Sequence, residues 1–162
     1  MQTRRGGAAA KAGHDLDIEV TAWEATLEIG EDPSAMRAEL TADATSLRVR
    51  TGTGGMQALG DDDKDSIHQT IDDEVLKRQD IVFRSTGVAP SGDGLRVEGE
   101  LTLAGTTKPL AFDLAMGDGG ALAGTATVTQ TDFGMKPYSA LWGALKVLDE
   151  VEVALEGKLA VG

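Results

Sequence analysis

The sequence predicts an all-β protein, an antiparallel β-barrel of about eight strands, on three observations. First, apolar and polar residues alternate over about eight segments, and successive side chains of a strand point to opposite faces of a sheet. Second, the chain has 21 glycines and only 4% aromatic residues, which is typical of tight turns and bent strands. Third, only one long segment has helical periodicity. Since a single sheet of this size leaves exposed edges, closure into a barrel is the simplest architecture.

The clearest strand pattern is a predicted hairpin over residues 95–116. Apolar residues occupy every second position before and after the sequence AGTTKP, so both strands have one apolar and one polar face. We expect a connection longer than two residues, with Gly105 in the turn and Pro109 where the second strand begins. The predicted inward positions are Leu95, Val97, Gly99, Leu101, Leu103, Leu110, Phe112, Leu114 and Met116.

Similar alternation predicts the remaining strands. Residues 14–29 form either two strands or one long strand with a bulge that bends the sheet. Residues 51–60 are too rich in glycine for a regular element, so we expect a flexible loop there. The other predicted strands cover residues 36–49, 81–88, 121–129 and 150–156.

The helical pattern covers residues 61–77. Four aspartates crowd its start, where carboxylates favour the positive end of a helix dipole. Its apolar stripe consists of Ile67, Ile71, Val75 and Leu76, and His68 lies off this stripe and is predicted to be exposed. The acidic cluster lacks the ligand spacing of a calcium loop, so we expect no metal site. A short helical segment is also predicted near residues 137–146, where the strand rhythm breaks.

Length and charge limit the class of protein. The 162 residues predict a flexible N-terminal arm over residues 1–12 and a single domain over residues 13–162. The absence of cysteine removes thiol chemistry, and a net charge of −12 argues against nucleic acid as a partner. The sequence shows neither a signal-peptide apolar core of about 7–15 residues nor about 20 consecutive apolar residues. We therefore expect a cytoplasmic protein without an integral membrane segment, as a monomer or homodimer.

Three motifs carry a family resemblance. DIVFRSTGV covers residues 80–88, GELTLAGTTKPLAFDL covers residues 99–114, and DFG covers residues 132–134. With the order of helix and strands, they resemble the YceI-like family over most of residues 14–157. This resemblance implies a lipocalin-like barrel that binds a long apolar chain, typically a polyisoprenoid, in its interior. The opening strand departs from the family, where an aromatic-rich sequence is common.

The predicted ligand-binding residues are large apolar side chains that the alternation turns inward or that suit a cavity mouth. An interior lined by many small residues, enclosed by about eight strands, leaves room for one ligand. The resemblance makes that ligand an apolar, polyisoprenoid-like lipid, and Lys108 or Lys136 is a candidate partner for an anionic head group. The predicted binding set is Trp23, Leu27, Ile29, Phe83, Leu101, Leu103, Phe112, Leu114, Met116, Phe133, Tyr138, Leu141 and Trp142.

The sequence offers no recognisable catalytic constellation. His14 and Asp15 are strand neighbours that point to opposite faces, and Ser139 lacks the flanking glycines of a nucleophile elbow. We therefore expect a non-catalytic protein without a cofactor that carries or sequesters its ligand. Two alternatives stay open. A barrel enzyme, an isomerase or cyclase acting on an apolar substrate, would have a buried carboxylate or histidine inside; a ligand-free protein-interaction scaffold would have a filled interior.

Overall fold

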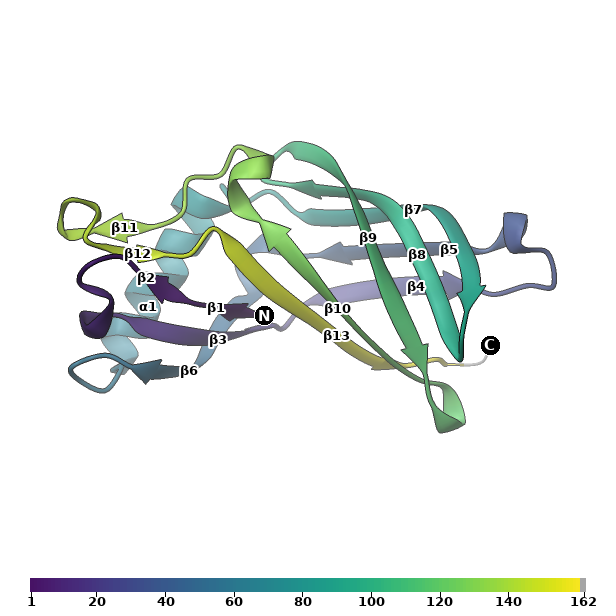
Figure 1. Ribbon diagram of the computed structural model, residues 1–162, viewed down its shortest axis with the longest axis horizontal. Helices are drawn as coiled ribbons and strands as arrows, with labels where there is room; N and C mark the ends of the chain where they lie inside the picture. Colours follow the sequence, from purple (N-terminus) through teal and green to yellow (C-terminus); the bar gives the residue numbers. More distant parts are fainter. Residues whose placement is uncertain (161–162) are drawn as a thin grey trace.

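The protein is built around one curled antiparallel sheet of ten strands, in the order β4-β5-β7-β8-β9-β10-β13-β1-β3-β6 (Figure 1). The computed structural model describes residues 1–160. A second sheet has the order β11-β12-β2. The strands of the main sheet are β1 (Gln2–Thr3), β3 (His14–Val20), β4 (Trp23–Glu28), β5 (Arg37–Ala42), β6 (Leu47–Gly54), β7 (Ile81–Ser91), β8 (Gly94–Leu103), β9 (Thr106–Met116), β10 (Ala121–Thr129) and β13 (Glu150–Lys158). The small sheet contains β2 (Arg5–Gly6), β11 (Ser139–Ala140) and β12 (Leu145–Val147). The predicted antiparallel barrel class is confirmed.

A long bent hairpin joins the two ends of the main sheet. Its base is the pair β3–β6 and its outer half is the pair β4–β5, with Val20 opposite Leu47 and Trp23 opposite Ala42. The base pairs with β1 and the outer half with β7, so the chain itself links both ends of the strand order. Residues 14–29 therefore form two strands within one hairpin, and a register shift between Asp17 and Ile18 adds a bulge in the base.

The predicted hairpin at residues 95–116 is the β8–β9 pair. Its apolar positions from Leu95 to Leu114 face inward as the alternation requires, and Val97 is completely buried, whereas Met116 at the end of β9 is exposed. The connection is tighter than predicted, because Leu103 pairs with Thr106 and leaves only two residues in the turn. Ala104 and Gly105 both have positive φ, 47° and 78°, which matches the twist of a two-residue hairpin turn.

One helical segment, α1 (Asp61–Thr70) continued by a π-helical turn, η4 (Ile71–Val75), covers one end of the curled sheet (Figure 1). The predicted stripe of Ile67, Ile71, Val75 and Leu76 packs against the core. The amide of Leu76 donates to the carbonyl of Ile71 at 2.8 Å, which is the wider spacing of a π-turn. Among residues 1–160, no helix has the length and apolar character needed to cross a bilayer.

His68 differs from its predicted exposed position. Its side chain is only 19% exposed, and its Nε2 accepts a 2.9 Å hydrogen bond from the amide of Val49 in β6. Val49 lies beside the bulge of the β3–β6 pair, where the regular ladder is interrupted. The side chain thus pins the helix to the barrel wall.

Replacing His68 by phenylalanine is expected to destabilise the protein by about 1–3 kcal/mol, because the buried Val49 amide loses the acceptor that His68 supplies. Urea unfolding measures this difference. A His68→Gln variant keeps an acceptor on a flexible side chain and should recover part of the loss. Equal stability of both variants and the parent would contradict a pinning role for His68.

Three segments differ from prediction. Residues 1–12 contain β1 and β2 in place of a flexible arm, because Gln2 pairs with both Glu152 and Asp17. The predicted glycine-rich loop begins only after Gly54, since β3 supplies backbone partners for residues 51–54. The segment near residues 137–146 is mainly the β11–β12 hairpin, with one helical turn, η7 (Leu141–Gly143), at its tip.

Candidate functional site: an apolar cavity inside the barrel

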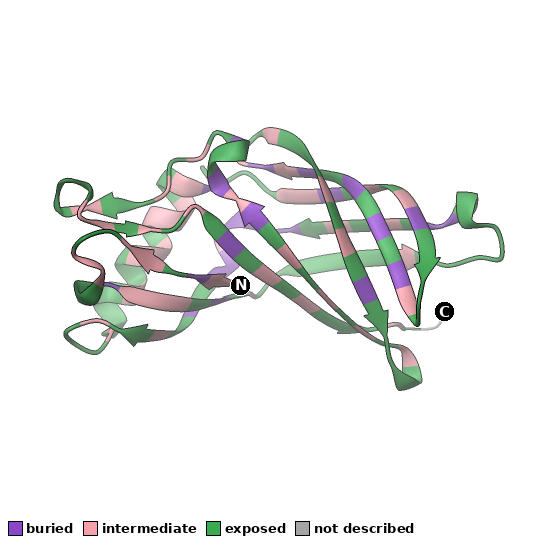
Figure 2. Ribbon diagram, viewed as in Figure 1, coloured by how far each residue is buried: buried purple, intermediate pink, exposed green. Residues whose placement is uncertain are grey.

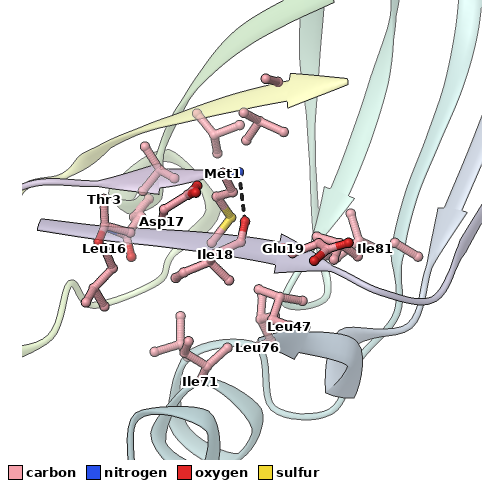
Figure 3. Close-up of a pocket in the computed structure, with 18 of the residues that line it drawn as sticks. Met1, Thr3, Leu16, Asp17, Ile18, Glu19, Leu47, Ile71, Leu76 and Ile81 are labelled. Atoms are coloured by element: carbon pink, nitrogen blue, oxygen red, sulfur yellow. Dashed lines mark hydrogen bonds between the residues drawn. The ribbon is translucent and has the colours of Figure 1, made fainter. Parts of the chain in front are cut away.

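The interior of the curled sheet is hollow. A cavity of about 1260 Å³ is lined by strands of the main sheet and by α1 and η4. Small-molecule sites typically occupy roughly 300–1,000 Å³, so this space is large enough for an extended ligand. Figure 3 shows part of the wall, where Met1 and Ile18 of the sheet face Leu47, Ile71 and Leu76 near the helical segment.

The wall opposite the helix comes from β7, β8, β9 and β10. The ring centroids of Phe83 and Phe112 lie 5.5 Å apart and the ring planes are inclined at 58°, a tilted arrangement that aromatic pairs favour. Gly99 allows this close packing, because a Cβ atom there would lie 2.5 Å from Cζ of Phe83 and 2.4 Å from the carbonyl oxygen of Arg84. The inward residues of β10 include small ones such as Ala126, which leave space in the cavity beside this strand.

Residues of both β4 and β13 line the cavity. β1 separates β13 from β3, and its first residue, Met1, donates from its amine to the carbonyl of Ile18 at 2.8 Å. β4 pairs only with β5, and residues 153–158 of β13 pair only with β10, so each has one unpaired edge within residues 1–160. Trp23 lines the cavity at this edge and is 43% exposed.

One group of polar residues that line the cavity lies near the N-terminal strands and the small sheet. Thr3 is buried, and its Oγ1 has no hydrogen-bond partner among the described residues. Gln130 is also buried, and its Nε2 donates to the carbonyl of Leu148 at 3.0 Å. Two cationic side chains, Arg5 and Lys146, line the same region. This end of the cavity can hydrogen-bond a polar group, whereas the rest of its wall is mainly apolar.

The carboxylates with shifted pKa values lie outside the cavity. A hydrogen bond from Ser34 lowers the pKa of Asp32, and hydrogen bonds from Thr45 lower the pKa of Asp43. Both carboxylates cap short helical turns. These shifts reflect local turn structure.

Eight of the thirteen predicted binding residues line the cavity, and five do not. Met116 ends β9 and Ile29 follows β4, and both are exposed at the surface. Phe133 is buried beside a separate small pocket of about 210 Å³. Leu141 and Trp142 lie at the exposed tip of the β11–β12 hairpin. The eight that line it are Trp23, Leu27, Phe83, Leu101, Leu103, Phe112, Leu114 and Tyr138.

Sequence reasoning missed the contribution of the N-terminal strands. Met1, Thr3 and Arg5 line the cavity, although strands of two residues leave no alternation to detect. The two lysines predicted for a head group, Lys108 and Lys136, do not line it. One sequence feature could have pointed to the N-terminal strands. Residues 1–13 contain no acidic residue, which sets this segment apart in an acidic chain.

The fold and the sequence both match known proteins. The YceI-like domain matches residues 8–159. Burkholderia cenocepacia BcnA is 15% identical, with 96% of this chain and 93% of that chain covered and a TM-score of 0.65. A mutant CJ YCEI protein with a monobromobimane guest structure is 14% identical, with 88% and 83% covered and a TM-score of 0.62.

The Campylobacter jejuni YCEI protein is 16% identical, with 88% of this chain and 85% of that chain covered and a TM-score of 0.52. Comparison with curated proteins gives no match. At such low identities the solved structures show the shared fold, and the domain match over nearly the whole chain shows the family. The chain therefore belongs to the YceI-like family.

Proposed function

We propose that the protein binds a long-chain apolar ligand, a polyisoprenoid-like lipid, inside the barrel and carries or sequesters it without catalysis. The observation that carries this proposal is the hollow, mainly apolar interior of about 1260 Å³. Each CH₂ group transferred from water contributes about 0.8 kcal/mol, roughly fourfold in affinity, so chain length is expected to dominate binding. The YceI-like fold is associated with binding apolar ligands, which agrees with this chemistry.

The unpaired edges of β4 and β13 support an entry route for such a chain. The cavity lining includes Trp23 and Leu27 of β4 and Val153 and Leu155 of β13. A ligand with a polar end would place that end near Thr3, whose hydroxyl is buried without a partner. An unsatisfied buried hydroxyl is costly, so a ligand that completes this hydrogen bond gains stability.

The two alternatives, a ligand-free interaction scaffold and a barrel enzyme, fit the interior less well. A scaffold with a filled barrel does not account for the volume of the cavity. The buried polar groups that line it are an alcohol, Thr3, and an amide, Gln130, whereas Asp17 and Glu19 are exposed and His14 is only half-buried. Alcohols and amides orient a ligand but are poor proton-transfer groups near neutral pH. A cytoplasmic location remains a prediction from the sequence.

The test is to extract the purified protein with organic solvent and identify the extract by mass spectrometry. We expect a stoichiometric apolar lipid, or uptake of added solanesol by the lipid-free protein, observed as a native mass shift. Protein that contains no lipid and takes up neither solanesol nor farnesol would contradict the proposal.

A further inference from the structure

The small sheet ends in an exposed apolar tip. Trp142 is fully exposed, at 103%, and the neighbouring Leu141 is 58% exposed. Both have positive φ, 57° and 52°, a region that residues with side chains rarely adopt. Figure 2 shows the β11–β12 hairpin projecting from one end of the molecule with its tip exposed. Strained, exposed large apolar residues point to a contact that the isolated chain does not make.

The charge of the same region is opposite to that of the rest of the chain. We call residues 1–13 together with residues 133–148 the basic tip. It holds five basic residues and no acidic residue, whereas the remainder holds 10 basic (15 − 5) and all 27 acidic residues. None of the five forms an ion pair with any residue in the range 1–160. The five are Arg4, Arg5, Lys11, Lys136 and Lys146.

Backbone hydrogen bonds join the two segments of the basic tip into one unit. β12 pairs with β2, and the amide of Ala9 donates to the carbonyl of Ala144 at 2.7 Å. The amide of Leu148 donates to the carbonyl of Arg4, also at 2.7 Å. Cations from both ends of the sequence are therefore held around one projecting apolar hairpin.

We propose that the basic tip docks on an anionic lipid bilayer, with Trp142 and Leu141 in the interfacial region and the cations against lipid head groups. Tryptophan favours the boundary between water and hydrocarbon, and clustered Lys and Arg are attracted to anionic lipids. A basic surface alone would suit any polyanion, but the exposed Trp-Leu tip fits a surface with an apolar layer beneath its charges. Since Arg5, Tyr138 and Lys146 also line the cavity, docking would bring its polar end to the bilayer.

The acidic remainder of the chain limits the strength of docking. The aspartates at the start of α1, Asp61, Asp62, Asp63 and Asp65, belong to the element that covers the same end of the sheet. Lys64 approaches Asp61 at 3.9 Å, so part of this charge is balanced. Charges farther than about 8 Å are screened at physiological salt. Docking is therefore expected to be reversible and sensitive to salt.

Co-sedimentation of the full chain with vesicles tests the proposal. We expect binding to vesicles of phosphatidylcholine mixed with phosphatidylglycerol, and much weaker binding to phosphatidylcholine alone or at high salt. The double variant Lys11→Glu and Lys136→Glu should bind at least about 25-fold more weakly, since each of the two lost cations contributes about fivefold near an anionic surface. Trp142→Asn should also weaken binding, and asparagine tolerates positive φ, so the hairpin is kept.

Lys158→Glu is the matched charge control, because Lys158 is exposed at the end of β13 and outside the basic tip. It should bind within about twofold of the parent, because it lies far from the docked surface. Absence of binding to the anionic vesicles at low salt, an equal loss in Lys158→Glu, or unchanged binding of Trp142→Asn would each overturn the proposal. Docking needs no ligand in the cavity, so these outcomes are independent of the extraction experiment.

Discussion

Replacing Ala126 by tryptophan should reduce the affinity for solanesol at least about tenfold, which corresponds to about 1.4 kcal/mol. Ala126 lies midway along β10 and lines the cavity, so an indole there projects into the space that an extended chain needs. The loss should be smaller for the shorter farnesol, which can occupy the cavity on one side of the obstruction. Displacement of a fluorescent apolar probe by each alcohol measures both affinities.

Ala123→Trp is the matched control for this substitution. Ala123 lies three residues earlier on the same strand, is exposed and does not line the cavity, so its side chain points to the outer face. The parent and the control should bind both alcohols alike. Equal affinity of all three proteins for solanesol would show that the ligand does not enter the barrel, and equal losses for both alcohols would exclude an extended chain as the bound form.

Replacing Gly99 by alanine should destabilise the fold by about 2–3 kcal/mol, because the added methyl group overpacks a rigid place. The new Cβ atom would lie 2.4 Å from the carbonyl oxygen of Arg84 and 2.8 Å from Cα of Ser85, both backbone atoms of β7. The β7–β8 register shifts directly beside Ser85, so β7 is bent against this glycine. Thermal and urea unfolding measure the loss.

Gly157→Ala provides the comparison. Gly157 also lies in a strand, β13, but a Cβ atom there would meet nothing within 4 Å, and its φ is not positive. Alanine should leave stability unchanged or raise it by up to about 1 kcal/mol through the lower entropy of the unfolded chain. Similar losses at both positions would mean that Gly99 is required for backbone freedom in general and not for the close approach of β7.

Regular elements with long periodic patterns were predictable from the sequence. Ten residues of alternation fix the inward face of β8, and the stripe from Ile67 to Leu76 fixes the packed face of the helix. The residues near 137–146 were harder, because Leu141 and Trp142 adopt positive φ without a glycine at either position. His68 was misplaced because its partner is a backbone amide of β6, the last strand of the sheet, and the side-chain pattern does not reveal a backbone partner.

The sequence predicted that an apolar cavity exists, but not how large it is. The inward face of each strand followed from alternation, and Phe83 and Phe112 lie on the wall as expected. Its size depends on how far the sheet curls and on how far β1 extends between β13 and β3. The extent of β1 comes from tertiary pairing by Gln2 and Met1, in a segment too short to carry a periodic signal.

The open edges of β4 and β13 also affect how readily the protein aggregates. Exposed strand edges can template pairing between molecules, the first step toward fibrils, and charged residues along an edge oppose it. Here Glu24 and Glu28 lie on β4, Glu156 lies on the open part of β13, and the sequence pI is about 4.5. Acidification toward that value reduces the net charge that keeps the molecules apart, while the backbone donors and acceptors of the open edges stay free. The open edges of β4 and β13 are thus also where mildly acidic, concentrated solutions should first polymerise the protein.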